Sequence, residues 1–172
     1  MSLSKRGIGP SLIGRALRLL TQREHSRLEL ARKLKAHAES PDALQTVLDD
    51  LERRGLLSDQ RFAESLAHRR SSRFGLRRIQ QELQTHKLDA SVSAPVIEAL
   101  RGSERARARE AWLRRFGGPP QDATERARQH RFLAQRGFTS DAIGWVLKHG
   151  VSEDAEVGVS ESVWGREDLD GE

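Results

Sequence analysis

The stretch Val47-Leu-Asp-Asp-Leu-Glu-Arg-Arg-Gly-Leu-Leu-Ser-Asp-Gln-Arg-Phe-Ala-Glu-Ser-Leu66 contains the end of one helical unit and the beginning of the next. Apolar residues recur at helical spacing on both sides of Gly55. Gly55 follows two arginines and is a typical helix stop, because glycine readily adopts the left-handed conformation of a C-terminal cap. Ser58 or Asp59 can then open another helix. The stretch therefore predicts two helices joined by a short turn.

The same apolar pattern returns twice along the chain. When the chain is shifted by 49 residues and then by 50, apolar positions superimpose without a gap in three separate helical segments. The superimposed sets are Ile13, Phe62 and Trp112; Leu17, Leu66 and Phe116; Leu34, Leu83 and Leu133; Val47, Val96 and Val146; and Leu48, Ile97 and Leu147. This constant offset predicts three copies of a three-helix unit. Because so small a unit buries little surface alone, neighbouring units should stack into an elongated array.

Start and stop signals divide the chain into about nine short helices. The expected starts are Ser26 with Glu29 as a capping box, Ser40 with Pro41, Ser58 or Asp59, Ser91 or Ser93 near Pro95, Asp122 with Glu125, and Thr139; the expected ends are Gly55, Gly137 and Gly150, with Gly75 between two helices and a turn at Gly117–Pro120. We therefore predict an all-α fold with an N-terminal lead at 1–9, three-helix repeats at 10–57, 58–102 and 103–150, and a disordered acidic tail at 151–172.

Charge is distributed unevenly along the chain. The formal net charge is +5, but residues 151–172 hold eight acidic residues and one arginine, so this tail carries −7 and residues 1–150 carry +12. A charge of that size favours an anionic partner or a mixed-charge protein surface. Arginine supplies 25 of the 30 basic residues, which suits bidentate contacts to phosphate or carboxylate. One hypothesis is that the acidic tail folds back on the basic face and competes with such a partner.

The composition excludes several classes of protein. Without cysteine the chain has no disulfide, thiol nucleophile or iron–sulfur cluster. Apolar runs stay well below the ~20 residues of a membrane span, and charged residues interrupt any signal-peptide core, which favours a cytoplasmic protein. The six histidines are dispersed, and no glycine-rich loop precedes a Lys-Ser or Lys-Thr pair. We therefore expect no enzyme, no cofactor and no metal.

Arginines form three clusters, and two of them are the candidate binding residues; the other, Arg105-Ala-Arg-Ala-Arg109, runs toward Arg114 and Arg115. The first candidate cluster surrounds the expected turn at Gly75 and comprises Arg69, Arg70, Arg73, Arg77 and Arg78. The second comprises Arg126, Arg128, Arg131 and Arg136. Such clusters neutralise phosphates or pair with acids on a protein partner, whereas a solvated face of intramolecular ion pairs is the alternative. Phe74 is the aromatic residue best placed to stack on a base, although packing at the turn also explains it.

Residues 26–57 also resemble a helix-turn-helix, with a capped helix, a turn at Ser40-Pro41 and a second amphipathic helix. A winged variant would continue with alternating strand residues, but residues 59–70 keep helical spacing. A single recognition helix also does not explain why the unit recurs twice. Direct binding of DNA or RNA by a helical protein stays open as the alternative function.

Four groups of short motifs extend across the three predicted repeats. They are Arg23-Glu-His-Ser-Arg-Leu-Glu-Leu30 with Lys33-Leu34; Leu48-Asp-Asp-Leu51 with Gly55-Leu-Leu-Ser-Asp59 and Arg61-Phe-Ala63; Arg78-Ile79 with Glu82-Leu83; and Arg131-Phe-Leu133 with Arg136-Gly-Phe138 and Ile143. Their order and spacing resemble the RecX family, the regulators of the RecA recombinase. The resemblance covers residues 12 to 149 and leaves the acidic tail outside.

The resemblance implies a non-catalytic modulator. RecX-like proteins bind the RecA filament on DNA, lie along its helical groove and span neighbouring protomers. They hinder filament extension and lower strand exchange, ATP hydrolysis and coprotease activity, so the implied role belongs to DNA repair, recombination and the SOS response. The implied partners are the RecA filament and the single- or double-stranded DNA within it, and we expect a monomer without membrane association. An elongated basic array can follow such a groove, which a compact globule cannot.

Overall fold

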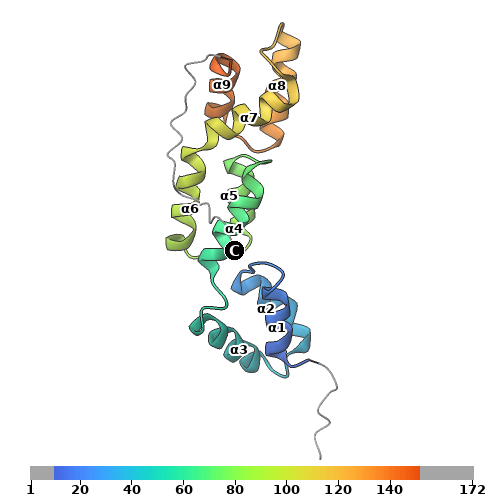
Figure 1. Cartoon of the computed structure of the whole chain (residues 1–172), viewed down its shortest axis with the longest axis vertical. Helices are drawn as coiled ribbons and strands as arrows, with labels where there is room; N and C mark the ends of the chain where they lie inside the picture. The colour runs from blue at the N-terminus through green and yellow to red at the C-terminus, as the bar shows by residue number, and fades with distance from the viewer. Residues whose placement is uncertain (1–9, 152–172) are drawn as a thin grey trace, which may run out of the picture.

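The structure, a computed structural model, describes residues 10–151, and this part of the chain is helical without strands. Its helices are α1 (Leu12–Leu20), α2 (Arg27–Leu34), α3 (Pro41–Arg53), α4 (Asp59–Ser71), α5 (Leu76–Gln84), α6 (Ala90–Gly102), α7 (Glu104–Phe116), α8 (Ala123–Gln135) and α9 (Ser140–His149), with a 3-10 turn, η1 (Lys35–His37), after α2. They form three consecutive groups of three along one long axis (Figure 1). This confirms the predicted all-α array. The lead at 1–9 and the tail from residue 152 lie outside the described residues.

Each group of three helices, which we call repeats one, two and three, packs around its own small core. All fifteen apolar residues that superimpose in the sequence lie in one of these three cores or pack against it. Leu34, Leu83 and Leu133 mark the shared position most clearly, since each is at most 2% exposed. The repeat in the sequence is therefore a repeat of core positions.

Most predicted helix starts are confirmed by side-chain caps. Ser26, Ser40, Ser58, Asp122 and Thr139 each accept a hydrogen bond from the backbone N–H three residues further on. Glycines with positive φ end α3 and α8, at Gly55 (69°) and Gly137 (81°), as expected.

Two predicted details are wrong. The predicted capping box is only half formed, because the carboxylate of Glu29 pairs with Arg23 instead of returning to the Ser26 N–H. The sixth helix begins at Ala90 rather than at Ser91 or Ser93, so Pro95 lies inside it. The carbonyl of Asp89 already accepts backbone hydrogen bonds that close the first turn, and the Ser93 hydroxyl donates to that carbonyl instead of capping.

A carboxylate joins each repeat to the next in the same way. Asp59, the first residue of α4, accepts a hydrogen bond at 2.7 Å from the backbone N–H of Arg27, the first residue of α2. Glu104, the first residue of α7, accepts one at 3.0 Å from the N–H of Leu76, the first residue of α5. The first N–H groups of a helix lack intrahelical acceptors, and the positive end of its dipole favours a negative charge. Each new repeat therefore caps the middle helix of the previous one.

The joint between repeats two and three is buried and involves the backbone. Glu104 is 4% exposed and also accepts from the backbone N–H (3.1 Å) and the hydroxyl (2.8 Å) of Thr139. The N–H of Gly75 donates to the carbonyl of Arg136 at 2.9 Å. A Cβ atom on Gly75 would lie 2.2 Å from the nitrogen of Phe138, so only glycine fits there. The two repeats are thus held in a fixed register.

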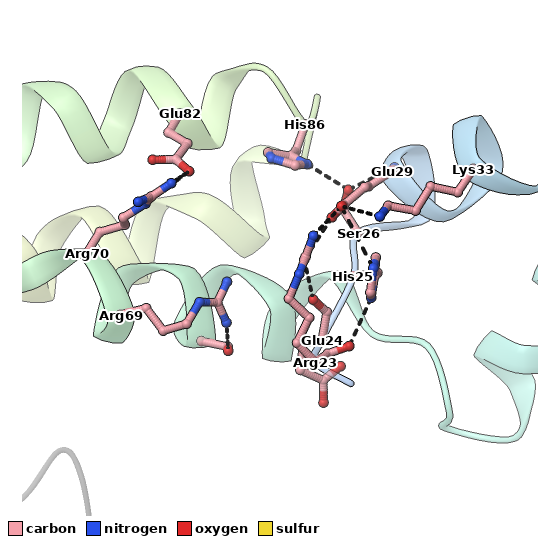
Figure 2. A network of polar contacts seen from close by, with 11 residues as sticks. Arg23, Glu24, His25, Ser26, Glu29, Lys33, Arg69, Arg70, Glu82 and His86 are labelled. Atoms are coloured by element: carbon pink, nitrogen blue, oxygen red, sulfur yellow. Dashed lines mark hydrogen bonds and ion pairs between the residues drawn. The ribbon is translucent and has the colours of Figure 1, made fainter. Parts of the chain in front are cut away.

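The joint between repeats one and two is made largely of polar side chains (Figure 2). The Ser26 hydroxyl and the Nδ1 atom of His86 form a hydrogen bond of 2.8 Å, and Arg61 pairs with Glu24 at the same distance. His25 lies in the chain between Glu24 and Ser26 and is only 1% exposed. Burial lowers its pKa. Burial also lowers the pKa of His86. The motif that begins at Arg23 is therefore a structural element that connects two repeats.

Candidate binding surface

Arginines and aromatic rings from repeats two and three gather along their joint, where they form a surface that we call the arginine–aromatic band. Its members are Arg73, Phe74 and Arg78 from repeat two, and Arg115, Phe116, Phe132 and Arg136 from repeat three. The backbone contact that brings Gly75 against Arg136 also places the two halves of the band side by side.

Helix ends position most of these side chains. Phe74 follows the end of α4, and both polar groups of its backbone are hydrogen-bonded. Its N–H donates to the carbonyl of Arg70 (3.0 Å), and its carbonyl accepts from the Arg107 guanidinium (2.9 Å). Phe116 is the last residue of α7, and Arg136 is the C-terminal cap of α8. Arginine is favourable at these ends because the helix dipole is negative there.

The arginines of the band lie over its rings. The Cζ atom of Arg78 is 4.1 Å from the ring centre of Phe74, and that of Arg136 is 3.6 Å from the ring centre of Phe132. Phe116 contacts Phe132 edge to face, with centres 5.1 Å apart. A guanidinium over a ring contributes about 0.5–1 kcal/mol at an exposed site. Stacking also orders the guanidinium plane, which helps its N–H groups to bind an acceptor bidentately. One N–H group of Arg136 donates to the carbonyl of Phe132 at 3.4 Å.

The charges at the centre of the band are not neutralised by acids of the described chain. Among residues 10–151, Arg73, Arg78, Arg115 and Arg136 form no ion pair. The pKa of Arg136 is lowered, first by burial and then by the positive charges of its three neighbours in the band. A bound anion would relieve this repulsion, because an opposite charge stabilises the charged form of each arginine.

The structure brings together part of each arginine cluster predicted from the sequence. Arg73 and Arg78 from the first cluster meet Arg136 from the second. Arg70 lies at one edge of the band, where it faces the Phe74 ring at 5.8 Å and pairs with Glu82 at 2.8 Å.

The remaining predicted arginines are dispersed. Arg77 is exposed, and its backbone N–H belongs to the joint. Arg69 points toward repeat one, and its guanidinium donates to the hydroxyl of Ser65 (Figure 2). The pKa of Arg69 is lowered, first by burial and then by the positive charge of Arg23.

In repeat three, Arg128 lies at the other edge of the band, 5.7 Å from the Phe116 ring centre, and pairs with Glu125 at 3.2 Å. Arg126 and Arg131 lie elsewhere and line a groove between α8 and α9. The second cluster is therefore divided between two surfaces.

Three members of the band were not predicted as binding residues, namely Arg115, Phe116 and Phe132. The two phenylalanines occupy positions that the apolar pattern assigns to the core, and they do pack partly against it. A local signal was present, because the tripeptide Arg-Phe-Gly occurs at 73–75 and again at 115–117. The first copy lies just after α4, and the second spans the end of α7. Each of these helices is the first of its repeat.

Neither a metal site nor a membrane-spanning helix is found among residues 10–151. No three histidine, aspartate or glutamate side chains converge there as a metal site would require. No helix in this range has the length and apolar character needed to cross a membrane. Every buried polar side-chain atom described has a hydrogen-bond partner.

Comparison with known protein families finds three matches in the order of the repeats. The first three-helix domain of RecX matches residues 13–51, the second matches residues 58–94, and the third matches residues 103–147. Together they cover more than half of the chain, and each match falls within one repeat of the structure.

Individual proteins agree with these matches. The chain is 54% identical over 138 residues to the regulatory protein RecX of Leptothrix cholodnii, which covers 80% of this chain and 88% of that protein. It is 50% identical to the regulatory protein RecX of Ralstonia nicotianae, with 80% and 87% covered. The crystal structure of RecX from Lactobacillus salivarius superimposes with a TM-score of 0.64 at 18% identity, covering 80% of this chain and 92% of that one, and so shares the fold. The chain therefore belongs to the RecX family.

Proposed function

We propose that this protein binds the RecA–DNA filament along its groove and restrains it without catalysing a reaction. In this proposal a cytoplasmic monomer hinders filament extension and thereby lowers strand exchange, ATP hydrolysis and coprotease activity. The relatives bear the name regulatory protein RecX, which supports a regulatory role. The observation that carries the proposal is the arginine–aromatic band, whose four arginines form no ion pair within residues 10–151 and lie across a rigid joint.

The band suits a surface that offers both carboxylates and phosphates. Guanidinium groups bind either anion bidentately, and such charge-assisted hydrogen bonds are about twice as strong as neutral ones. The joint fixes the spacing of the arginines, because the backbone of Gly137 lies directly against Arg78. A preorganised surface loses less conformational entropy on binding, which increases its affinity. The elongated array then extends contacts along the groove, while this joint supplies an anchoring point.

Direct binding to naked nucleic acid is the second candidate, and the aromatic content of the band favours it. Proteins that hold single strands stack bases on exposed rings. In this band, however, the faces of Phe74 and Phe132 are covered by Arg78 and Arg136. Bases would have to displace these arginines, whereas phosphates and carboxylates can use them where they lie. The geometry therefore supports anion contacts over base stacking.

Binding to a labelled single strand, with and without a RecA coat, tests the proposal and separates the two candidates. We expect the coated strand to bind at least about tenfold more tightly than the naked strand, a difference of about 1.4 kcal/mol. Exchanging Arg78→Gln and Arg136→Gln should weaken binding to the coated strand, while the matched control Arg53→Gln with Arg101→Gln, from exposed sites outside the band, should not. Equal affinity for the naked strand, with a steep salt dependence, would overturn the proposal in favour of its rival.

A further inference from the structure

We propose that the acidic C-terminal segment, residues 152–172, binds the arginine–aromatic band of its own chain and is displaced when an anionic partner binds there. The inference rests on the proposed function in that it concerns regulation of the same surface. It assigns an occupant to the band in the free protein, and it predicts that this occupant competes with the filament.

The band has the charge that such an occupant requires. Its four central arginines have no acidic partner among residues 10–151. Two carboxylates at its edges are already engaged, since Glu82 pairs with Arg70 and Glu125 pairs with Arg128. The centre of the band therefore carries an excess of positive charge that the described repeats do not compensate.

The C-terminal segment has the complementary composition. Its acids are Glu153, Asp154, Glu156, Glu161, Glu167, Asp168, Asp170 and Glu172, against the single base Arg166, for a net charge of −7. The acids form two groups, near its beginning and at its end, with Trp164 between them. Carboxylates pair with guanidinium groups bidentately, and an indole ring can join a stack of arginines and aromatic rings.

The segment also begins beside α7, the helix that carries Arg115 and Phe116 at its end. The carbonyl of Gly150 accepts a hydrogen bond at 2.9 Å from Nε of Arg109 on α7. Arg115 lies on the same helix six residues further on, which is about 9 Å along the helix axis. The 21 residues after Val151 can extend up to roughly 70 Å, so the length of the chain is ample. A tether this short gives an effective concentration in the millimolar range, so even weak contacts would compete.

The contact can be measured in the isolated full-length protein with a spin label. The chain has no cysteine, so Ser160→Cys gives a single site for a nitroxide within the segment. We expect the label to attenuate the backbone amide signals of Phe74, Arg78 and Arg136 and to spare those of α3 in repeat one. The attenuation should disappear at about 0.5 M salt, where charges are screened within a few ångströms. No attenuation, or attenuation spread evenly over the three repeats, would overturn the proposal.

A full-length variant in which all eight acids are exchanged for amides, Glu→Gln and Asp→Asn, tests the competition. It should lose the attenuation and should bind the RecA-coated strand about three- to tenfold more tightly at low salt. A variant with the segment's residues shuffled keeps its charge and should behave like the wild type. Because the spin-label measurement contains no filament, it can fail or succeed independently of filament binding. Unchanged affinity after removal of the acids would overturn the competition that we propose.

Discussion

Glu104 is the residue on which the joint between repeats two and three depends most. Replacing it by alanine leaves the N–H groups of Leu76 and Thr139 without their acceptor in a buried place. We expect Glu104→Ala to lower the free energy of unfolding by about 2–4 kcal/mol, because unmade hydrogen bonds to a charged group are costly. Urea unfolding measures this. The matched control is Glu110→Ala on the same helix, whose exposed ion pair with Arg114 should be worth less than about 1 kcal/mol. Equal losses in the two variants would contradict the assigned role.

The two histidines at the first joint make stability depend on pH. Burial lowers the pKa of both His25 and His86 in the folded protein below the ordinary value of 6.5. As the pH falls below 6.5, the unfolded chain therefore binds protons first, and the free energy of unfolding decreases; above it, both states are neutral and the effect vanishes. Nearby carboxylates, Glu29 for both histidines and Glu82 for His86, oppose this effect, and arginines add to it.

Urea unfolding at pH 7.5 and pH 5.5 tests this dependence. The wild type should be less stable at the lower pH. The loss should shrink in His86→Gln and should persist in His37→Gln, which changes an exposed histidine of repeat one. A loss that is the same in all three proteins would show that the joint histidines do not cause it.

At the scale of elements, the close approach of α5 to the turn after α8 explains why glycine stands at position 75. An alanine there would place its Cβ within 2.4 Å of backbone atoms of Gly137 and Phe138. Backbone cannot move aside as a side chain does, so we expect Gly75→Ala to destabilise by about 2 kcal/mol or more. Gly102→Ala is the matched control, because its Cβ meets open space at the end of α6. Thermal unfolding should show a lower midpoint for the first variant alone, and equal midpoints would contradict the tight joint.

Most of the helical elements could be predicted because the signals that define them are local. A serine or aspartate at a helix start and a glycine at its end are visible within four residues of sequence. The errors arose where a side chain had a competing partner, as for Glu29 with Arg23, or where the backbone closed a turn early, as at Asp89. The boundaries that we place after residues 57 and 102 stay predictions.

At the scale of the whole molecule, the candidate site could be predicted only in part. The two predicted clusters group arginines that are close in sequence. In the structure, however, Arg128 and Arg131 of α8 lie on different surfaces. The band instead unites residues more than 60 positions apart, from Arg73 to Arg136. Only the packing of repeat three on repeat two creates it. Composition predicts an anionic partner, whereas the candidate place of contact could be identified only from the packing at the joint.

The proposed anchoring of the filament at the band is tested most directly by titrating the protein into preformed RecA–single-stranded DNA filaments and following ATP turnover. One variant exchanges Arg73, Arg78, Arg115 and Arg136 for glutamine, and a control exchanges the exposed Arg18, Arg53, Arg54 and Arg101. Both lose four positive charges, so general attraction falls equally. We predict that the concentration for half-inhibition rises at least about tenfold in the band variant and less than about threefold in the control. Equal shifts, or unchanged inhibition by the band variant, would contradict the account.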